Sequence, residues 1–179
     1  MASEISRRWR SKRAIDLDSQ LGPLRRGSGD PTWAQDAGGG IWRTSLTPQG
    51  PGVERLSVDA AAREVVQSSY GPGANWLCER LPRLLGAEDD PTGFVAPGPL
   101  RTTAKRYAAW RAGRTDLVLE ALVPAVLEQK VTGKEAWLGW RTLVRTFGTP
   151  APTPAGGPVG MRVFPAPAGW LAIPSWEWH

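Results

Sequence analysis

Apolar and polar positions alternate along the first part of the chain. In AIDLDSQL, residues 14–21, Ile15, Leu17 and Leu21 share one face of an extended strand, and the residues between them are mostly polar. Alternation recurs in IWRTSLT and VERLSVD, which follow the turn-rich segments GSGDPT and PQGPG. Period-two alternation is typical of half-buried strands, and glycine and proline clusters indicate turns. The pattern predicts an antiparallel sheet with one solvent-facing side over residues 14–72.

The spacing of the apolar residues changes near residue 73. GANWLCERLPRLLG places its leucines on one face of a helix, in which Pro82 either introduces a kink or opens a second short helix. A turn-rich loop and the basic, helix-compatible stretch LRTTAKRYAAWRAGR complete a connecting segment, residues 73–116. Strands followed by helices favour an α+β fold or two segregated modules.

Residues 117–147 show two helical stripes joined by a polar junction, EQKVTG. The apolar positions of the stripes are Leu119, Leu122, Val123, Val126 and Leu127, then Ala136, Trp137, Trp140, Leu143, Val144 and Phe147. In TGKE, Thr132 precedes Glu135 by three positions, which is the capping-box pattern. The free N–H groups of the second helix, beside Lys130 and Lys134, would attract an anion. Taken alone, the pattern also fits an ordinary helical hairpin.

Charge is distributed unevenly, although the net charge is only +5. Residues 1–30 carry seven Lys/Arg against four Asp/Glu, and residues 101–147 carry nine against four. Residues 31–100 carry five against eight. Two basic blocks fit a polyanion such as nucleic acid, although the charge alone favours a generally basic soluble surface. RRWRSKR predicts a basic N-terminal arm over residues 1–13, either solvated or in contact with phosphate.

The composition also argues against several kinds of site. No run of about 20 apolar residues is present, and no apolar stretch follows the basic start, so we expect neither a membrane span nor a secretory signal. Cys78 is the only cysteine and His179 the only histidine, and neither has ligand partners nearby in the sequence. We therefore expect a cytoplasmic protein without a metal or other cofactor.

LEALVPAVLEQKVTGKEAWLGWRTLVRTFG resembles the segment that opens the catalytic domain of the DNA-3-methyladenine glycosylase II family, in the helix-hairpin-helix superfamily of DNA glycosylases. PLRRGSGDPT, IWRTSLTPQGP and YGPGANWL resemble the β-rich N-terminal module of that family. The resemblance spans most of residues 14–179 and is strongest at 117–148. It implies DNA base-excision repair, in which an alkylated base of double-stranded DNA is extruded and its N-glycosidic bond hydrolysed.

The resemblance also implies where DNA would be contacted. In relatives, a side chain from this junction fills the space that the extruded nucleotide leaves in the duplex. Matching the motif residue by residue places Gln129 and Lys130 there, with Val131 and Thr132 supporting them and Lys134 beside the helix start. Some relatives have an apolar wedge where this chain has Lys130, whose methylenes would fill space less firmly. We expect these five residues to bind duplex DNA, in a chain that is a monomer.

The catalytic parts of the family do not match any segment of this sequence. No Leu-x-x-Leu-Pro-Gly-Val/Ile-Gly hairpin follows residue 148, and no aspartate follows Asp116. We therefore predict no catalytic residue here and describe residues 117–179 as the start of an incomplete, truncated glycosylase domain. The tryptophans of WLAIPSWEWH would then face a core supplied elsewhere, or pack back onto the β-rich module. A non-catalytic DNA-binding module and a non-functional remnant remain alternatives.

Overall fold

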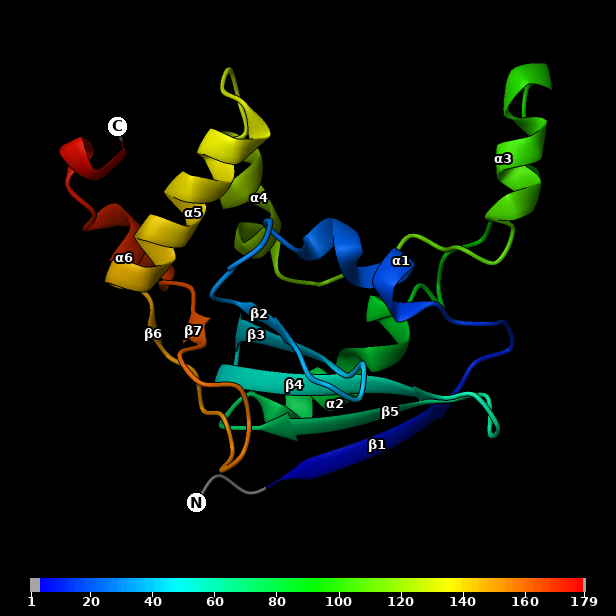
Figure 1. Cartoon of the computed structure of the whole chain (residues 1–179), viewed down its shortest axis with the longest axis horizontal. Helices are drawn as coiled ribbons and strands as arrows, with labels where there is room; N and C mark the ends of the chain where they lie inside the picture. Colours follow the sequence, from blue (N-terminus) through cyan, green and yellow to red (C-terminus); the bar gives the residue numbers. More distant parts are fainter. Residues whose placement is uncertain (1–3, 179) are drawn as a thin grey trace.

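The computed structural model describes residues 4–178, which form an α+β fold with one five-stranded antiparallel sheet (Figure 1). The strands are β1 (Ile5–Arg10), β2 (Trp33–Gln35), β3 (Ile41–Thr47), β4 (Gly50–Asp59), β5 (Glu64–Tyr70) and the short pair β6 (Thr149–Pro150) and β7 (Arg162–Val163). The helices are α1 (Leu17–Leu21), α2 (Ala74–Leu84), α3 (Arg101–Arg106), α4 (Val118–Leu127), α5 (Gly133–Phe147) and α6 (Pro167–Leu171). Short 3₁₀ turns are η1 (Gly22–Leu24), η2 (Gly98–Leu100) and η3 (Ser175–Trp178). No helix within the described residues is both long and apolar enough to cross a membrane.

The strand order of the large sheet is β1-β5-β4-β3-β2, and every neighbouring pair is antiparallel. The strands predicted in IWRTSLT and VERLSVD are confirmed as β3 and β4. In the register of the sheet, Leu56 on β4 lies opposite Ile41 on β3 and Gln67 on β5. This register places alternate residues of the three central strands on the same face.

The strand predicted at residues 14–21 is wrong, because this segment forms the short helix α1. The Asp16 carboxylate accepts hydrogen bonds from the backbone N–H and the hydroxyl of Ser19, which caps the start of the helix. Leu17 and Leu21 are four positions apart, so they share one face in a helix as well as in a strand. The apolar spacing alone did not distinguish the two structures.

The basic arm predicted at residues 1–13 is also corrected, because residues 5–10 form the edge strand β1. This strand pairs with β5 along its whole length, from Ile5 opposite Ser69 to Arg10 opposite Glu64. Burial alternates along β1, and Trp9 packs against the main core. Trp9 is thus half-buried on the same face of β1 as Ile5 and Arg7, while residues 1–3 lie outside the described part of the chain.

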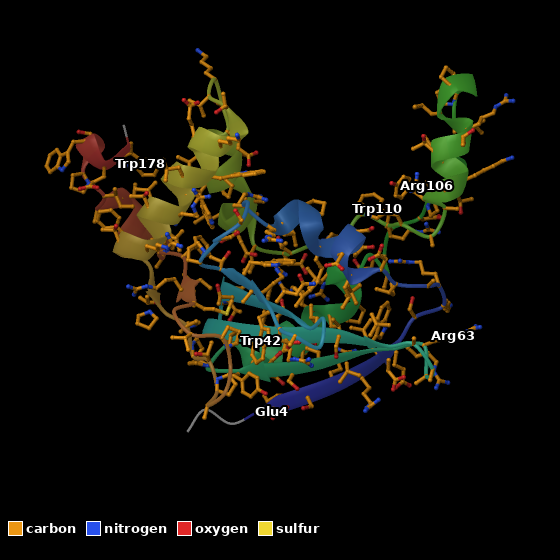
Figure 2. The ribbon with its side chains drawn as sticks, viewed as in Figure 1. Glu4, Trp42, Arg63, Arg106, Trp110 and Trp178 are labelled. Carbon is orange, nitrogen blue, oxygen red and sulfur yellow. The ribbon has the colours of Figure 1, made fainter. Side chains whose placement is uncertain are left out.

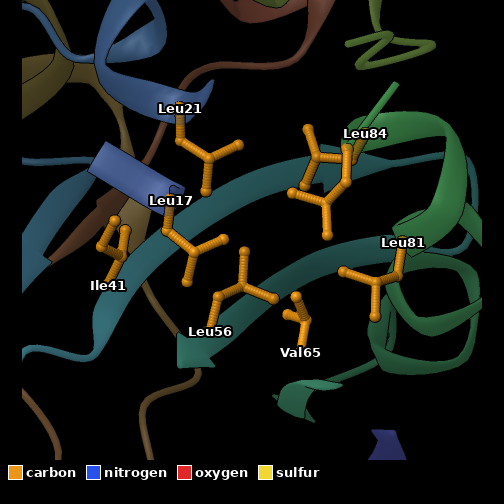
Figure 3. Close-up of a cluster of buried hydrophobic side chains, with 8 residues drawn as sticks. Leu17, Leu21, Ile41, Leu56, Val65, Leu81 and Leu84 are labelled. Atoms are coloured by element: carbon orange, nitrogen blue, oxygen red, sulfur yellow. The ribbon is translucent and has the colours of Figure 1, made fainter. Parts of the chain in front are cut away.

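Helices cover one face of the central sheet, whereas the other face is covered only near β3, so the predicted solvent-facing side is confirmed over β1 and β5, where Arg8 and Arg10 are exposed. On one face, Ile41, Leu56 and Val65 pack against leucines of α1 and α2 (Figure 3). On the other face, Trp42 and Val53 belong to a cluster that includes Tyr70 and Met161. Residue Met161 lies just before β7, so the chain after α5 supplies the cover that a local sequence pattern could not predict.

The C-terminal segment packs on α5 through Trp170. Trp170 is buried beside Trp140, with the two ring centroids 6.3 Å apart, and Phe164 and Ile173 join the same cluster. The expectation that all C-terminal tryptophans face a missing core is therefore wrong for Trp170. Trp176 is 71% exposed, so the expectation of an exposed aromatic side chain holds there.

The glycine- and proline-rich segment 148–160 contains a strand only at its start. Thr149 and Pro150 pair with β7, and the N–H of Ala151 donates to the carbonyl of Met161 at 3.0 Å. Residues 152–160 contain neither helix nor strand, as the glycine and proline content predicts.

Candidate nucleic-acid interface

The junction between α4 and α5 is a tight, exposed turn that ends in a capped helix start. The hydroxyl of Thr132 accepts a hydrogen bond from the N–H of Glu135 at 3.4 Å. The Glu135 carboxylate in turn accepts from the N–H of Thr132 at 2.9 Å. The predicted helices and the capping box are thus confirmed. The backbone N–H groups of Gly133 and Lys134, in the first turn, have no acceptor within the helix, and both residues are exposed.

The structure brings the five predicted DNA-contacting residues together at the tip of this helical pair (Figure 1). Gln129, Lys130, Thr132 and Lys134 are exposed, and Val131 is 48% exposed although it is apolar. Within residues 4–178, neither lysine forms an ion pair. The tip therefore offers two free cations, an amide and a helix N-terminus, all of which favour an anionic ligand.

The backbone of Lys130 has φ of +60°, in the left-handed region that glycine adopts most easily. A side chain in this conformation costs about 1–2 kcal/mol. The chain reverses direction between α4 and α5, and this turn requires the left-handed conformation at residue 130. A glycine at this position would adopt that conformation without the cost. Residues kept in unfavourable backbone conformations cluster at functional sites, so the lysine motivates a functional hypothesis.

Hydrogen bonds at the helix start favour the ionised form of the Glu135 carboxylate. Hydrogen bonds from the backbone and the side chain of Thr132 hold the pKa of Glu135 below its ordinary value. On the α4 side of the junction, the Glu128 carboxylate lies 3.8 Å from the guanidinium of Arg26. Both nearby carboxylates thus have partners within the protein, which leaves the two lysines free for an external anion.

A buried ionic network fixes α4 to the sheet. The Glu54 carboxylate, on β4, accepts from Arg80 at 2.6 Å and from Arg43 at 3.2 Å. Arg43 also donates to Glu120 of α4 at 2.7 Å, and Gln67 donates to Glu54 at 2.8 Å. Burial lowers the pKa of Arg80, while the adjacent Glu54 acts in the opposite direction. The network joins three strands to α2 and α4, so it sets where the helical pair begins.

The loop before β2 holds α5 in position through hydrogen bonds to a buried carboxylate. The indole N–H of Trp140 donates to the buried Asp30 carboxylate at 3.0 Å. Asp30 also accepts from the backbone N–H of Arg26 at 2.7 Å. Gly27 lies against the ring of Trp137, where a Cβ on the glycine would approach to 2.6 Å. The only signal of these contacts in the sequence is an aspartate at the end of the glycine-containing segment RRGSGD, so they were not predicted.

Other chemically suggestive residues have structural partners. Asp89 accepts from the N–H of Ala112, and Asp90 accepts from the N–H of Thr92. The Cys78 thiol is buried, and burial raises its pKa, so it is a poor nucleophile. The part of the chain that the structure describes contains no group of three side chains able to hold a metal ion. The exposed α4–α5 junction is the candidate site that the contacts above describe.

The fold is similar to that of a solved protein structure, although the sequence matches no known family. No known family's sequence model matches the chain, and no curated protein matches it. Among solved structures, the chain is similar to the 3-methyladenine DNA glycosylase from Archaeoglobus fulgidus, with 16% sequence identity and a TM-score of 0.64. The similarity covers 96% of this chain and 63% of that protein's chain. The chain thus shares the fold of a DNA glycosylase over almost its whole length, while it spans less than two thirds of the length of that protein.

Proposed function

We propose that this chain is the duplex-engaging part of a DNA-repair glycosylase scaffold for alkylated bases of the 3-methyladenine type. The observation that carries the proposal is the exposed, cationic junction with a capped helix start, on a fold similar to that of a 3-methyladenine DNA glycosylase. Likeness of fold alone does not assign a function, so the residues of the junction bear the argument.

The junction has two separable roles in this proposal. Lys134 and the N–H groups at the start of α5 bind a phosphate of the DNA backbone, as helix N-termini commonly do. Gln129 and Lys130, at the tip, enter the duplex where the damaged nucleotide is extruded, since the amide forms hydrogen bonds and the lysine methylenes fill space. Val131 and Thr132 maintain the shape of the turn.

The proposal does not extend to base removal by these 179 residues. The last aspartate, Asp116, is engaged with Arg83 at 2.6 Å, and the only later carboxylates besides the C-terminus are glutamates. Glu128 and Glu135 at the junction already have protein partners. We therefore propose recognition of the duplex without hydrolysis of the glycosidic bond by this chain alone.

Binding to a duplex with a stable abasic-site analogue, followed by fluorescence anisotropy over a range of salt concentrations, tests the proposal. Each lost phosphate contact lowers the slope of log K against log salt by about 0.9. The double variant Lys130→Gln, Lys134→Gln should bind more weakly, with a slope smaller by about 1 to 2. The matched control is Lys12→Gln, Arg63→Gln, which removes two exposed cations near the β4–β5 turn and should behave like the unchanged protein.

Four outcomes separate the alternatives. Preference for the abasic-site duplex over an undamaged one, lost in Gln129→Ala, supports insertion at a lesion. Equal binding to both duplexes, dependent on the two lysines, supports a non-catalytic DNA-binding module. Absence of binding contradicts both, and release of base from a methylated duplex contradicts the proposed lack of hydrolysis.

A further inference from the structure

Helix α3 is a second exposed basic element, separate from the junction. None of its six residues is buried. Figure 1 shows α3 projecting from the body on the same side as the α4–α5 tip, with α1 between them. Figure 2 places Arg106 and Trp110 on this projection, far along the molecule from Trp178.

The charge on α3 is not balanced by its surroundings. Between Asp90 and Asp116 the sequence contains five arginines and lysines and no carboxylate. Arg114 pairs with Glu88, and Arg111 donates to backbone carbonyls. The three cations of the helix itself have no ion-pair partner among residues 4–178: Arg101, Lys105 and Arg106.

The arrangement of these cations does not serve the stability of the helix. Arg101 and Lys105 are four positions apart on one face, where like charges destabilise a helix by about 0.2–0.5 kcal/mol. Arg106 lies about 140° around the helix from Arg101, since each residue adds about 100°. The three side chains therefore spread over one side of α3, which suits an extended anionic ligand better than a single small ion.

Aromatic side chains border the same basic surface. Tyr107 is 51% exposed, and the Arg106 guanidinium lies 5.8 Å from its ring centroid. The indole N–H of Trp110 donates to the carbonyl of Ser19 at 3.3 Å, which fixes the base of the projection to α1. The cations are the groups of this surface that can follow a nucleic-acid backbone, since aromatic rings beside cations stack on bases only where these are unpaired.

We propose that α3 is a second DNA-contacting element, in which Arg101, Lys105 and Arg106 bind backbone phosphates away from the lesion. This inference rests on the proposed function, because it requires that the junction engages the same duplex. An anionic membrane surface is less well supported, because α3 itself carries no large apolar side chain to insert between lipids. The contact adds affinity and salt dependence, and it carries no base specificity.

Salt-dependent binding to duplexes of two lengths tests the inference. A duplex of about 10 base pairs, roughly one helical turn, centred on the abasic-site analogue should reach the junction alone. A duplex of about 30 base pairs, roughly three turns, should reach both elements and give a steeper salt slope. The triple variant Arg101→Gln, Lys105→Gln, Arg106→Gln should lower the slope on the long duplex by about 2 to 3 and leave the short duplex unaffected.

The control variant removes three exposed cations elsewhere: Arg8→Gln, Lys12→Gln, Arg63→Gln. It should retain the length dependence, and circular dichroism should show unchanged folding of both triple variants. If the α3 variant keeps the full slope on the long duplex while the junction variant loses slope, the α3 inference is wrong and the proposed function stands. If the unchanged protein binds neither duplex, both are wrong. Loss of binding to phosphatidylserine vesicles with unchanged DNA binding would assign α3 to a membrane surface instead.

Discussion

The central sheet and the α4–α5 helical pair use the same kinds of residue in opposite ways. In the sheet, apolar side chains such as Val53 and Leu56 are completely buried, because helices cover one face and the chain around Met161 covers part of the other. In the helical pair, one side packs in the core around Trp140, whereas Leu122 and Leu138 remain largely exposed. Exposed apolar surface beside an exposed cationic tip is typical of an interaction surface.

Charged residues show the same contrast. Glu54 is buried among two arginines and a glutamine, so its charge is used within the protein. Lys130 and Lys134 are exposed and have no carboxylate partner within the described residues, so their charge is available to a ligand. A charged residue therefore indicates function in this molecule only after its partners are known.

Removing the central buried carboxylate should have the largest effect on stability. Glu54→Gln leaves Arg80 and Arg43 without their shared partner, and breaking a buried ion pair in this way costs about 3–5 kcal/mol. Glu88→Gln removes an exposed carboxylate from Arg114 and should cost at most about 1 kcal/mol. Urea unfolding measures both, and equal costs would contradict the contrast between buried and exposed charge.

Two leucines on the same helix compare the packed and open sides of α5. Leu143→Ala should lower the free energy of unfolding by about 2–5 kcal/mol, because Leu143 is 1% exposed within the helical cluster. Leu138→Ala should change it by no more than about 0.5 kcal/mol, because Leu138 is 58% exposed. Thermal and urea unfolding give the two values. A large loss in Leu138→Ala would show that the exposed side is packed in solution.

Removing the helix cap at the junction should lower the free energy of unfolding by a smaller amount. Thr132→Ala removes the hydroxyl that accepts from the N–H of Glu135 and should cost about 1 kcal/mol. Thr146→Ala, at an exposed position near the other end of α5, is the matched control and should cost only a few tenths of a kcal/mol. Equal effects in urea unfolding would mean that the cap does not stabilise α5.

The smallest expected effect is the pH dependence that the cap contributes. Because hydrogen bonds from Thr132 hold the pKa of Glu135 below its ordinary value, the carboxylate stabilises the fold above that ordinary value. This contribution should be lost as the pH falls through the lowered pKa. The stability difference between the unchanged protein and Glu135→Gln should therefore shrink on acidification, as followed by urea unfolding at several pH values. A difference that stays constant would contradict this assignment.

Local patterns in the sequence were sufficient for the helical pair and for two strands. The capping box needs only Thr132 and Glu135 three positions apart, and the stripes of α4 and α5 repeat at helical spacing. The alternation in β3 and β4 also marks the strands correctly. These features depend on residues close in sequence, so a single sequence was enough to place them.

Features that depend on distant contacts were missed. The strand β1 exists because Ile5 to Arg10 find a partner in β5, about sixty positions later in the chain. Glu54 occupies the buried face of the sheet because Arg43 and Arg80 reach it from other elements, and Gln67 is buried there because it donates to Glu54 and to the carbonyl of Leu77. No local pattern distinguishes such buried charges from solvent-facing ones, so the network that positions α4 could not be predicted.

Backbone hydrogen exchange, measured with and without a duplex that contains the abasic-site analogue, tests most directly whether the α4–α5 junction meets DNA. Bound DNA should slow exchange at residues 129–134, above all at the free N–H groups of Gly133 and Lys134, and leave the β4–β5 turn unchanged. Unchanged exchange at the junction in a DNA-bound sample, or slowing confined to the sheet, would contradict the proposed interface.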